Sequence, residues 1–226
     1  RMDDRFFENK YTTMIKNMYF DKRSLETPFK RSVAVHWYIG ESGSGKTTLI
    51  RAVLVLLPSG GKVTEGSIRF QDRELTKVSE QEMRDIRGKD IALIFQDVGS
   101  ALDPINRIRR QYEESIKVHE KLSKKDYYAK AVNMLKRVQL NDAERVMDAY
   151  PFELSGGMKQ RVGIAMGMTA KPKLLLADEP TSALDVTIQA QVVQQLKELR
   201  DLFGVTIIMV THNMGVASYL SDKIGV

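Results

Sequence analysis

The sequence contains no cysteine among its 226 residues, which excludes a disulfide framework, a thiolate zinc site, an iron–sulfur cluster and a cysteine nucleophile within them. Long apolar runs are missing too. The longest, Ala52–Leu57 and Leu174–Ala177, are far shorter than the roughly 20 residues that span a bilayer. The first residues, Arg1–Lys10, are charged and lack the apolar stretch of a signal peptide. We therefore expect a soluble, cytoplasmic protein that reaches a membrane only through a partner.

A block of charge of one sign is also absent. The chain carries 35 Lys and Arg against 29 Asp and Glu, a net charge of +6. The basic residues are scattered among acidic ones, as in Asp72–Glu74 and Lys121–Asp126. This scatter is typical of an ordinary solvated surface, so the charge predicts no nucleic-acid partner.

Short apolar segments alternate with segments of helical length. We expect strands at Val33–Ile39, Ser67–Phe70, Ile91–Phe95, Lys173–Ala177 and Val205–Val210. We expect helices at Lys46–Leu57, Glu80–Arg87, Ser155–Thr169 and Thr187–Phe203. Strands that alternate with helices predict an α/β fold around a parallel sheet.

The segment Ile105–Ala149 differs from the rest because it is polar, charged and prone to form helices. Its apolar residues recur at helical spacing, at Ile108, Tyr112, Ile116, Ala131, Met134, Leu135 and Val138. This spacing predicts an inserted lobe of amphipathic helices.

A phosphate-binding loop is predicted where an expected strand leads into an expected helix. The pattern G-x-x-x-x-G-K-[ST] is formed by Gly40, Glu41, Ser42, Gly43, Ser44, Gly45, Lys46 and Thr47. Its glycines let successive backbone N–H groups surround phosphate oxygens at the positive end of the helix. Lys46 is expected to reach the β- and γ-phosphates, and the Thr47 hydroxyl to hold Mg²⁺.

Two adjacent carboxylates, Asp178 and Glu179, follow the apolar strand Leu174–Ala177. The carboxyl ends of parallel strands line the crevice where ligands bind, so Asp178 is expected to meet the Mg²⁺ of the phosphate loop. Glu179 is expected to polarise the attacking water as a general base.

A second anion site is predicted at Ser155, Gly156 and Gly157. Ser155 occupies an N-cap position, and the two glycines leave the N–H groups of a new helix accessible. A nucleoside triphosphate already has its own loop at Gly40–Thr47. The economical interpretation is that this second site binds the γ-phosphate held by another copy of the domain.

Together these motifs resemble the nucleotide-binding domain of ATP-binding cassette (ABC) transporters. They stand in the family's order and cover most of residues 38–226. The matching elements are the phosphate loop, Phe95–Asp97, Leu154–Arg161, Asp178–Glu179, Ser182–Asp185 and His212. The resemblance implies a single ABC ATPase domain. A P-loop NTPase (RecA-like) core with a partly antiparallel β lobe would take up residues 1–96 and 154–226, and an inserted α-helical lobe residues 97–153.

Three further stretches resemble the ATPase subunits of dipeptide, oligopeptide and nickel importers: Ser100–Pro104, Tyr150–Leu154 and Asp185–Gln191. This narrower resemblance implies uptake of a peptide, nickel or a related small solute through membrane permease subunits, with an extracytoplasmic solute-binding protein acting indirectly. It places the protein at the cytoplasmic face of the cell membrane.

The resemblance implies ATP and Mg²⁺ as cofactors. The phosphate loop, extended to Thr48, would bind the ATP phosphates. Thr47, Asp178 and Gln96 would serve the Mg²⁺ or its waters. Gln96 and the helical lobe would report nucleotide state to the permease.

The catalytic residues implied by the resemblance are Glu179, as the base, and His212, which would contact the γ-phosphate and help to hold the attacking water. Ser155–Gly157 would close on the ATP of an identical or homologous second subunit in a head-to-tail dimer. Asp185 would support that interface.

The two ends of the chain fit the family poorly. The adenine-stacking aromatic is not fixed by the motifs; Tyr19 or Phe20 could supply it, or both could belong to the core. The chain stops at Val226 inside what looks like another strand, so we expect a truncated C-terminal end. Two alternatives remain: a soluble ABC ATPase acting on nucleic acid or ribosomes, and a degenerate cassette that binds ATP without hydrolysing it.

Overall fold

The computed structural model describes residues 18–20, 35–39, 43–58, 61–182, 184–213, 215 and 222–225. Gly40, Glu41 and Ser42 of the predicted phosphate loop lie outside the described residues. So do the side chains of Tyr19 and Phe20, and therefore the choice of an adenine-stacking residue.

The main sheet is parallel throughout the described strands, in the order β5-β6-β7-β2-β8. These strands are β5 (Ile91–Ile94), β6 (Leu174–Asp178), β7 (Thr206–Thr211), β2 (Val35–Ile39) and β8 (Lys223–Gly225). All five residues of β6 are buried, as expected for a central parallel strand covered on both faces.

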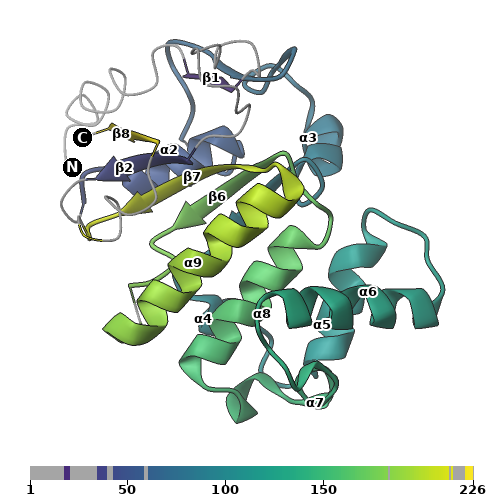
Figure 1. The fold of residues 1–226 in the computed structure, drawn as a ribbon. Coiled ribbons are helices and arrows are strands. Elements are labelled where there is room, and N and C mark those ends of the chain that lie inside the picture. Colours follow the sequence, from purple (N-terminus) through teal and green to yellow (C-terminus); the bar gives the residue numbers. More distant parts are fainter. Residues whose placement is uncertain are drawn as a thin grey trace, which may run out of the picture.

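Helices cover both faces of this sheet (Figure 1). Successive residues of a strand point to opposite faces. Leu175 and Ala177 of β6 accordingly belong to the apolar cluster of α8 (Gly156–Met168) and α9 (Val186–Phe203). Leu174 and Leu176 belong to the cluster of α2 (Lys46–Val53). The parallel sheet thus forms the middle layer of the domain.

Helix α2 is shorter than the sequence predicts, because it ends at Val53 rather than Leu57. Val55 takes a left-handed backbone conformation with φ 54°. The N–H groups of Val55 and Leu56 donate to the carbonyls of Ala52 and Arg51, which closes the last helical turn. The apolar pattern continued past Val53, but the chain turns there before Pro58.

A smaller sheet joins β1 (Met18–Phe20), β3 (Ile68–Phe70) and β4 (Arg73–Glu74). β1 runs parallel to β3, and β4 runs antiparallel to it. Helix α3 (Glu80–Ile86) begins with a capping box in which Ser79 and Glu82 bond each other's backbone. This mixed sheet beside a parallel α/β core confirms the predicted fold class.

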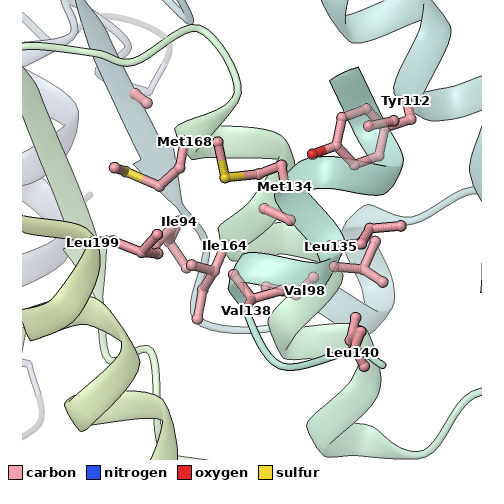
Figure 2. Packing of buried hydrophobic residues seen from close by; sticks show 14 of the residues in the cluster. Ile94, Val98, Tyr112, Met134, Leu135, Val138, Leu140, Ile164, Met168 and Leu199 are labelled. Carbon is pink, nitrogen blue, oxygen red and sulfur yellow. The ribbon is translucent and has the colours of Figure 1, made fainter. Parts of the chain in front are cut away.

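Helices fill the segment for which we expect an α-helical lobe: α4 (Val98–Ala101), α5 (Ile108–Lys117), α6 (Lys124–Arg137), α7 (Ala143–Asp148) and the 3₁₀ turn η2 (Pro151–Glu153). They pack on α8, which separates them from the main sheet. Figure 2 shows Ile164 of α8 between Ile94 of β5 and Val138 at the end of α6. In the described part of the chain, no helix has both the length and the apolar character needed to cross a bilayer.

The contact between α4 and α8 is tight at Gly163. A Cβ at this position would lie 2.5 Å from Val98 Cγ1 and 2.9 Å from Val98 Cγ2. Valine has little freedom to rotate out of the way. We expect Gly163→Ala to lower the free energy of unfolding by about 1–3 kcal/mol through overpacking, despite the better helix propensity of alanine. Chemical denaturation measures this.

Gly167 on the same helix provides a matched control. A Cβ there would meet its nearest neighbours, Ala92 Cβ and Ile94 Cγ1, only at 3.9 Å. Gly167→Ala should therefore raise the free energy of unfolding by up to about 1 kcal/mol. Adding Val98→Ala to Gly163→Ala should recover part of the loss, and a Gly163→Ala protein as stable as the wild type would contradict the packing.

Candidate functional site

The first half of the site joins the phosphate loop to the end of β6. Gly43 and Gly45 have φ values of 81° and 92°, a conformation that glycine adopts without steric cost. Gly45 is the N-cap of α2 and makes no side-chain cap, so α2 begins with N–H groups open to an anion. In the first turn of α2, Thr47 Oγ1 donates to Asp178 Oδ1 over 3.1 Å.

Asp178 is almost fully buried, with 7% of its surface exposed. Burial raises the pKa of Asp178 above its ordinary value, and the charge of Glu179 acts in the same direction, while the Thr47 hydrogen bond opposes both. A cation bound beside Asp178 and the Thr47 hydroxyl would stabilise the ionised form of this buried carboxylate. Carboxylate and hydroxyl oxygens are hard ligands of the kind that Mg²⁺ prefers, so these two side chains fit the predicted ion.

Glu179 lies at the centre of the second half of the site. Its Oε2 accepts a hydrogen bond from Gln96 Nε2 at 3.3 Å and lies 3.1 Å from His212 Nδ1. The Glu179 side chain is only 15% exposed, whereas His212 is 60% exposed. The resemblance implies that Gln96 serves the Mg²⁺ or its waters, and in the structure its side-chain amide bonds Glu179.

The backbone of Glu179 is strained, with φ 43° at a residue that is not glycine. Its N–H donates to the carbonyl of Val210, and its carbonyl accepts from the N–H and the hydroxyl of Ser182. Such a conformation persists only where its surroundings enforce it, and it is common at catalytic positions. It turns Glu179 out of the line of β6 while Asp178 stays in the strand.

These residues meet because each follows a strand of the same parallel sheet. The phosphate loop follows β2, Gln96 follows β5, and His212 follows β7, while Asp178 ends β6. In a parallel sheet, all carboxyl ends lie at one edge, where ligands bind. The structure therefore brings together Thr47, Gln96, Asp178, Glu179 and His212 from distant parts of the sequence.

The predicted second anion site lies at the start of α8. Ser155 Oγ accepts from the N–H of Met158 at 3.3 Å as its N-cap, and Ser155 and Gly156 are exposed. A Cβ on Gly157 would lie 3.0 Å from Ile188 Cγ2 on α9. Asp185 caps α9 by accepting from the N–H of Ile188 at 3.0 Å. Ile188 thus connects Asp185 to the glycine segment.

Sequence reasoning missed Gln189 and Asn213. The side-chain amide of Gln189 bonds two carbonyls in the loop that follows Glu179, and it accepts from Asn213, next to His212. Several glutamines lie along α9, and no spacing rule distinguishes Gln189 from Gln191 or Gln194. Only the fold reveals the link.

No group of three or more His, Asp or Glu side chains that could hold a metal occurs in the described part of the chain. A metal bound by Thr47 and Asp178 would therefore take its other ligands from a bound phosphate and water. This pattern is usual for Mg²⁺, which keeps several waters and binds proteins through one or two carboxylates plus substrate phosphates.

The fold and this site define a P-loop nucleotide-binding domain. The family model described as "ABC transporter" matches residues 31–182, and the chain belongs to this family. It is 43% identical over 187 residues to the oligopeptide transport ATP-binding protein AppD of Bacillus subtilis; the aligned residues are 82% of this chain and 57% of AppD. It is 44% identical over 186 residues to the oligopeptide transport ATP-binding protein OppD of Salmonella typhimurium; the aligned residues are 82% of this chain and 55% of OppD.

A solved structure resembles the chain in fold as well. The dimeric post-hydrolysis state of the ATP-binding cassette MJ0796, bound to ADP and Pi, superposes with a TM-score of 0.71 at 31% identity, covering 84% of this chain and 82% of that one. The chain spans just over half the length of the curated relatives described above.

The buried charge of Asp178 predicts a pH-dependent stability. Because the pKa of Asp178 is raised in the folded protein, ionisation of its side chain lowers the free energy of unfolding. This loss increases as the pH rises from the ordinary pKa of an aspartic acid through the folded pKa. Asp178→Asn removes the charge and keeps an oxygen for Thr47. Without nucleotide or metal, we expect the variant to unfold at a higher temperature than the wild type at pH 7.

This gain should shrink as the pH falls through the folded pKa towards the ordinary pKa of an aspartic acid. It should vanish below that value, where the wild-type carboxyl is protonated in both the folded and the unfolded state. Thermal unfolding followed by circular dichroism at pH 7 and pH 4 measures the difference. A gain that was absent at pH 7, or larger at pH 4, would contradict the assignment of a destabilising buried charge.

Proposed function

We propose that this protein is the ATP-hydrolysing subunit of an ABC importer that takes up peptides, or nickel or a related small solute, through membrane permease subunits. The observation that carries the proposal is the cluster at the carboxyl edge of the sheet, in which Glu179 lies between Gln96 and His212, directly after the Thr47–Asp178 pair. The similarity to oligopeptide transport ATP-binding proteins supports the transported class.

The proposed mechanism assigns each side chain a part in the attack of water on the γ-phosphate. Thr47 and Asp178 would hold Mg²⁺, which would supply positive charge to neutralise the phosphates. Lys46 and the open N–H groups of the loop bind the phosphates. Glu179 accepts a proton from the attacking water, and its contacts with Gln96 and His212 fix the direction of its carboxylate.

Replacement of Glu179 tests the assignment of the general base. Glu179→Gln keeps the size of the side chain and removes its basicity. We expect the variant to bind ATP as the wild type does and to hydrolyse it at least about 100-fold more slowly, because a general base contributes about 10²–10⁴ in rate. It should also accumulate an ATP-bound dimer, detectable by size-exclusion chromatography.

Glu114→Gln is the matched control, since it makes the same chemical change in an exposed ion pair with Arg110. It should alter the rate less than twofold, because exposed pairs contribute little. Normal turnover by Glu179→Gln would refute the proposed mechanism.

The proposed active unit is a head-to-tail dimer of cassettes. Ser155 and Gly156 are exposed at the start of α8, where their N–H groups are available to an anion from outside the subunit. Asp185 is exposed beside them. The likeness to a dimeric cassette supports this arrangement.

An arginine at Ser155 tests the action of this segment in trans. We expect Ser155→Arg to leave the affinity of the monomer for ATP within about twofold of wild type, and to prevent closure of the dimer by filling the anion site. Equilibrium binding of a fluorescent ATP analogue and analytical ultracentrifugation give the two quantities.

Ser123 provides the control, because it is also an N-cap, that of α6, and accepts from the N–H of Asp126 at 3.2 Å. Ser123→Arg removes a similar N-cap, which typically lowers the free energy of unfolding by about 1 kcal/mol, and it should leave the dimer intact. If Ser155→Arg abolished binding of ATP to the monomer, the proposed trans action would be wrong.

A groove beside Gln96 offers a surface to the permease. A cavity of about 250 Å³ opens between β5, α4, α5 and α8, and its lining includes Phe95, Leu102, His119 and Met166. Phe95, the neighbour of Gln96, is 54% exposed. A permease segment seated there would touch both the helical lobe and the strand that leads to Gln96, which is how nucleotide state would be reported to the membrane.

The alternative is a soluble ABC ATPase that acts on nucleic acid or ribosomes. The named relatives favour the importer, because both are transport proteins. The proposed location is therefore the cytoplasmic face of the cell membrane, where the protein is held by permease subunits, with a solute-binding protein acting on the far side.

A further inference from the structure

Gln189 connects the two loops that carry the Glu179–His212 pair. It lies in the first turns of α9, and both ends of its side-chain amide are used. Nε2 donates to the carbonyls of Thr181 at 2.9 Å and Leu184 at 3.1 Å. Oε1 accepts from Asn213 Nδ2 at 3.4 Å.

The first of these loops, which follows Glu179, contains two backbone turns among its described residues. The N–H of Ser182 donates to the carbonyl of Glu179 at 3.1 Å, and in the next turn the N–H of Leu184 donates to the carbonyl of Thr181 at 3.2 Å. Gln189 adds two bonds to this turn and so fixes it against α9. The turn lies between Glu179 and Asp185, which caps the same helix.

The second loop, which follows β7, is held through Asn213. The N–H of Asn213 donates to Thr211 Oγ1 at 3.1 Å, and Asn213 Oδ1 accepts from the N–H of Gly215 at 3.0 Å. With its Nδ2 on Gln189, the Asn213 side chain is held at both ends. Because Asn213 directly follows His212, this bonding fixes the backbone from which His212 reaches Glu179.

We propose that Gln189 is a positioning residue for ATP hydrolysis: it couples the loop between Glu179 and Asp185 to the loop of His212, so that contact at Asp185 in the closed dimer aligns His212 with Glu179. This proposal rests on the proposed function. The side-chain bonds of Gln189 go to two backbone carbonyls and to Asn213, so Gln189 acts through the positions of its neighbours.

Replacing Gln189 with methionine removes all three hydrogen bonds and keeps the length of the side chain. We expect kcat for ATP hydrolysis to fall about tenfold or more, because small displacements of catalytic groups cost rate steeply, while KM for ATP stays within about twofold. If part of the variant were unfolded, the apparent kcat would fall as well, but amide exchange would not become faster in the loop after β7 alone. Amide exchange is therefore measured too.

Hydrogen exchange gives a readout that does not depend on hydrolysis. Gln189→Met should speed exchange of the Gly215 amide, whose acceptor is Asn213 Oδ1. Gln194→Met is the control, since Gln194 lies on the same helix and bonds Glu198 on the exposed surface. It should change neither kcat nor the exchange of Gly215.

Asn213→Ala cuts the same link from the other side and carries the test if Gln189→Met fails to fold. Its loss of kcat should be similar, and the double variant should be no slower than the slower single variant. Losses that multiply in the double variant would overturn the coupling, as would a Gln189→Met enzyme with wild-type kcat. If the wild type shows no ATPase activity, the proposed function is wrong. In that case the exchange of the Gly215 amide still tests the coupling, which is refuted if Gln189→Met leaves that exchange unchanged.

Discussion

The parallel order of the main sheet is the constraint on which the site depends. Because β2, β5, β6 and β7 point the same way, the residues after them meet at one edge although they are far apart in the sequence. The two apolar layers on β6 hold that edge rigid, since the strand has no exposed residue. The proposed chemistry uses side chains at strand ends, and the described residues contain no cluster of three or more His, Asp or Glu that could hold a metal.

Helix α8 connects the site to the rest of the molecule. Its start carries Ser155 and the exposed glycine segment, and its middle packs between the sheet and the helices of residues 98–153 (Figure 2). The close contact of Gly163 with Val98 adds α4, which begins just after Gln96. A movement of these helices against the sheet would therefore be felt both at Gln96 and at the proposed dimer interface, through packing rather than through a flexible linker.

Much of this arrangement follows from the sequence. The apolar run ending in Asp178 predicts a buried strand with carboxylates at its end, and the glycine pattern before Lys46 predicts the phosphate loop. Other features need the fold. The apolar pattern ran on past Val53, whereas a left-handed residue ends α2 there. The direction of the Gln96 amide and the bonds of Gln189 depend on tertiary distances that periodicity does not encode.

The central claim is that residues at the strand ends enclose one Mg²⁺–ATP and that a second copy completes the site. A crystal structure of the Glu179→Gln protein with ATP and Mg²⁺ tests this most directly. The account predicts Mg²⁺ bonded to the Thr47 hydroxyl beside Asp178, at the roughly 2.1 Å typical of this ion, with the Ser155–Gly157 segment of the second copy against the γ-phosphate. Nucleotide bound away from Thr47 and Asp178, or a Ser155–Gly157 segment facing only solvent in an ATP-bound dimer, would contradict it.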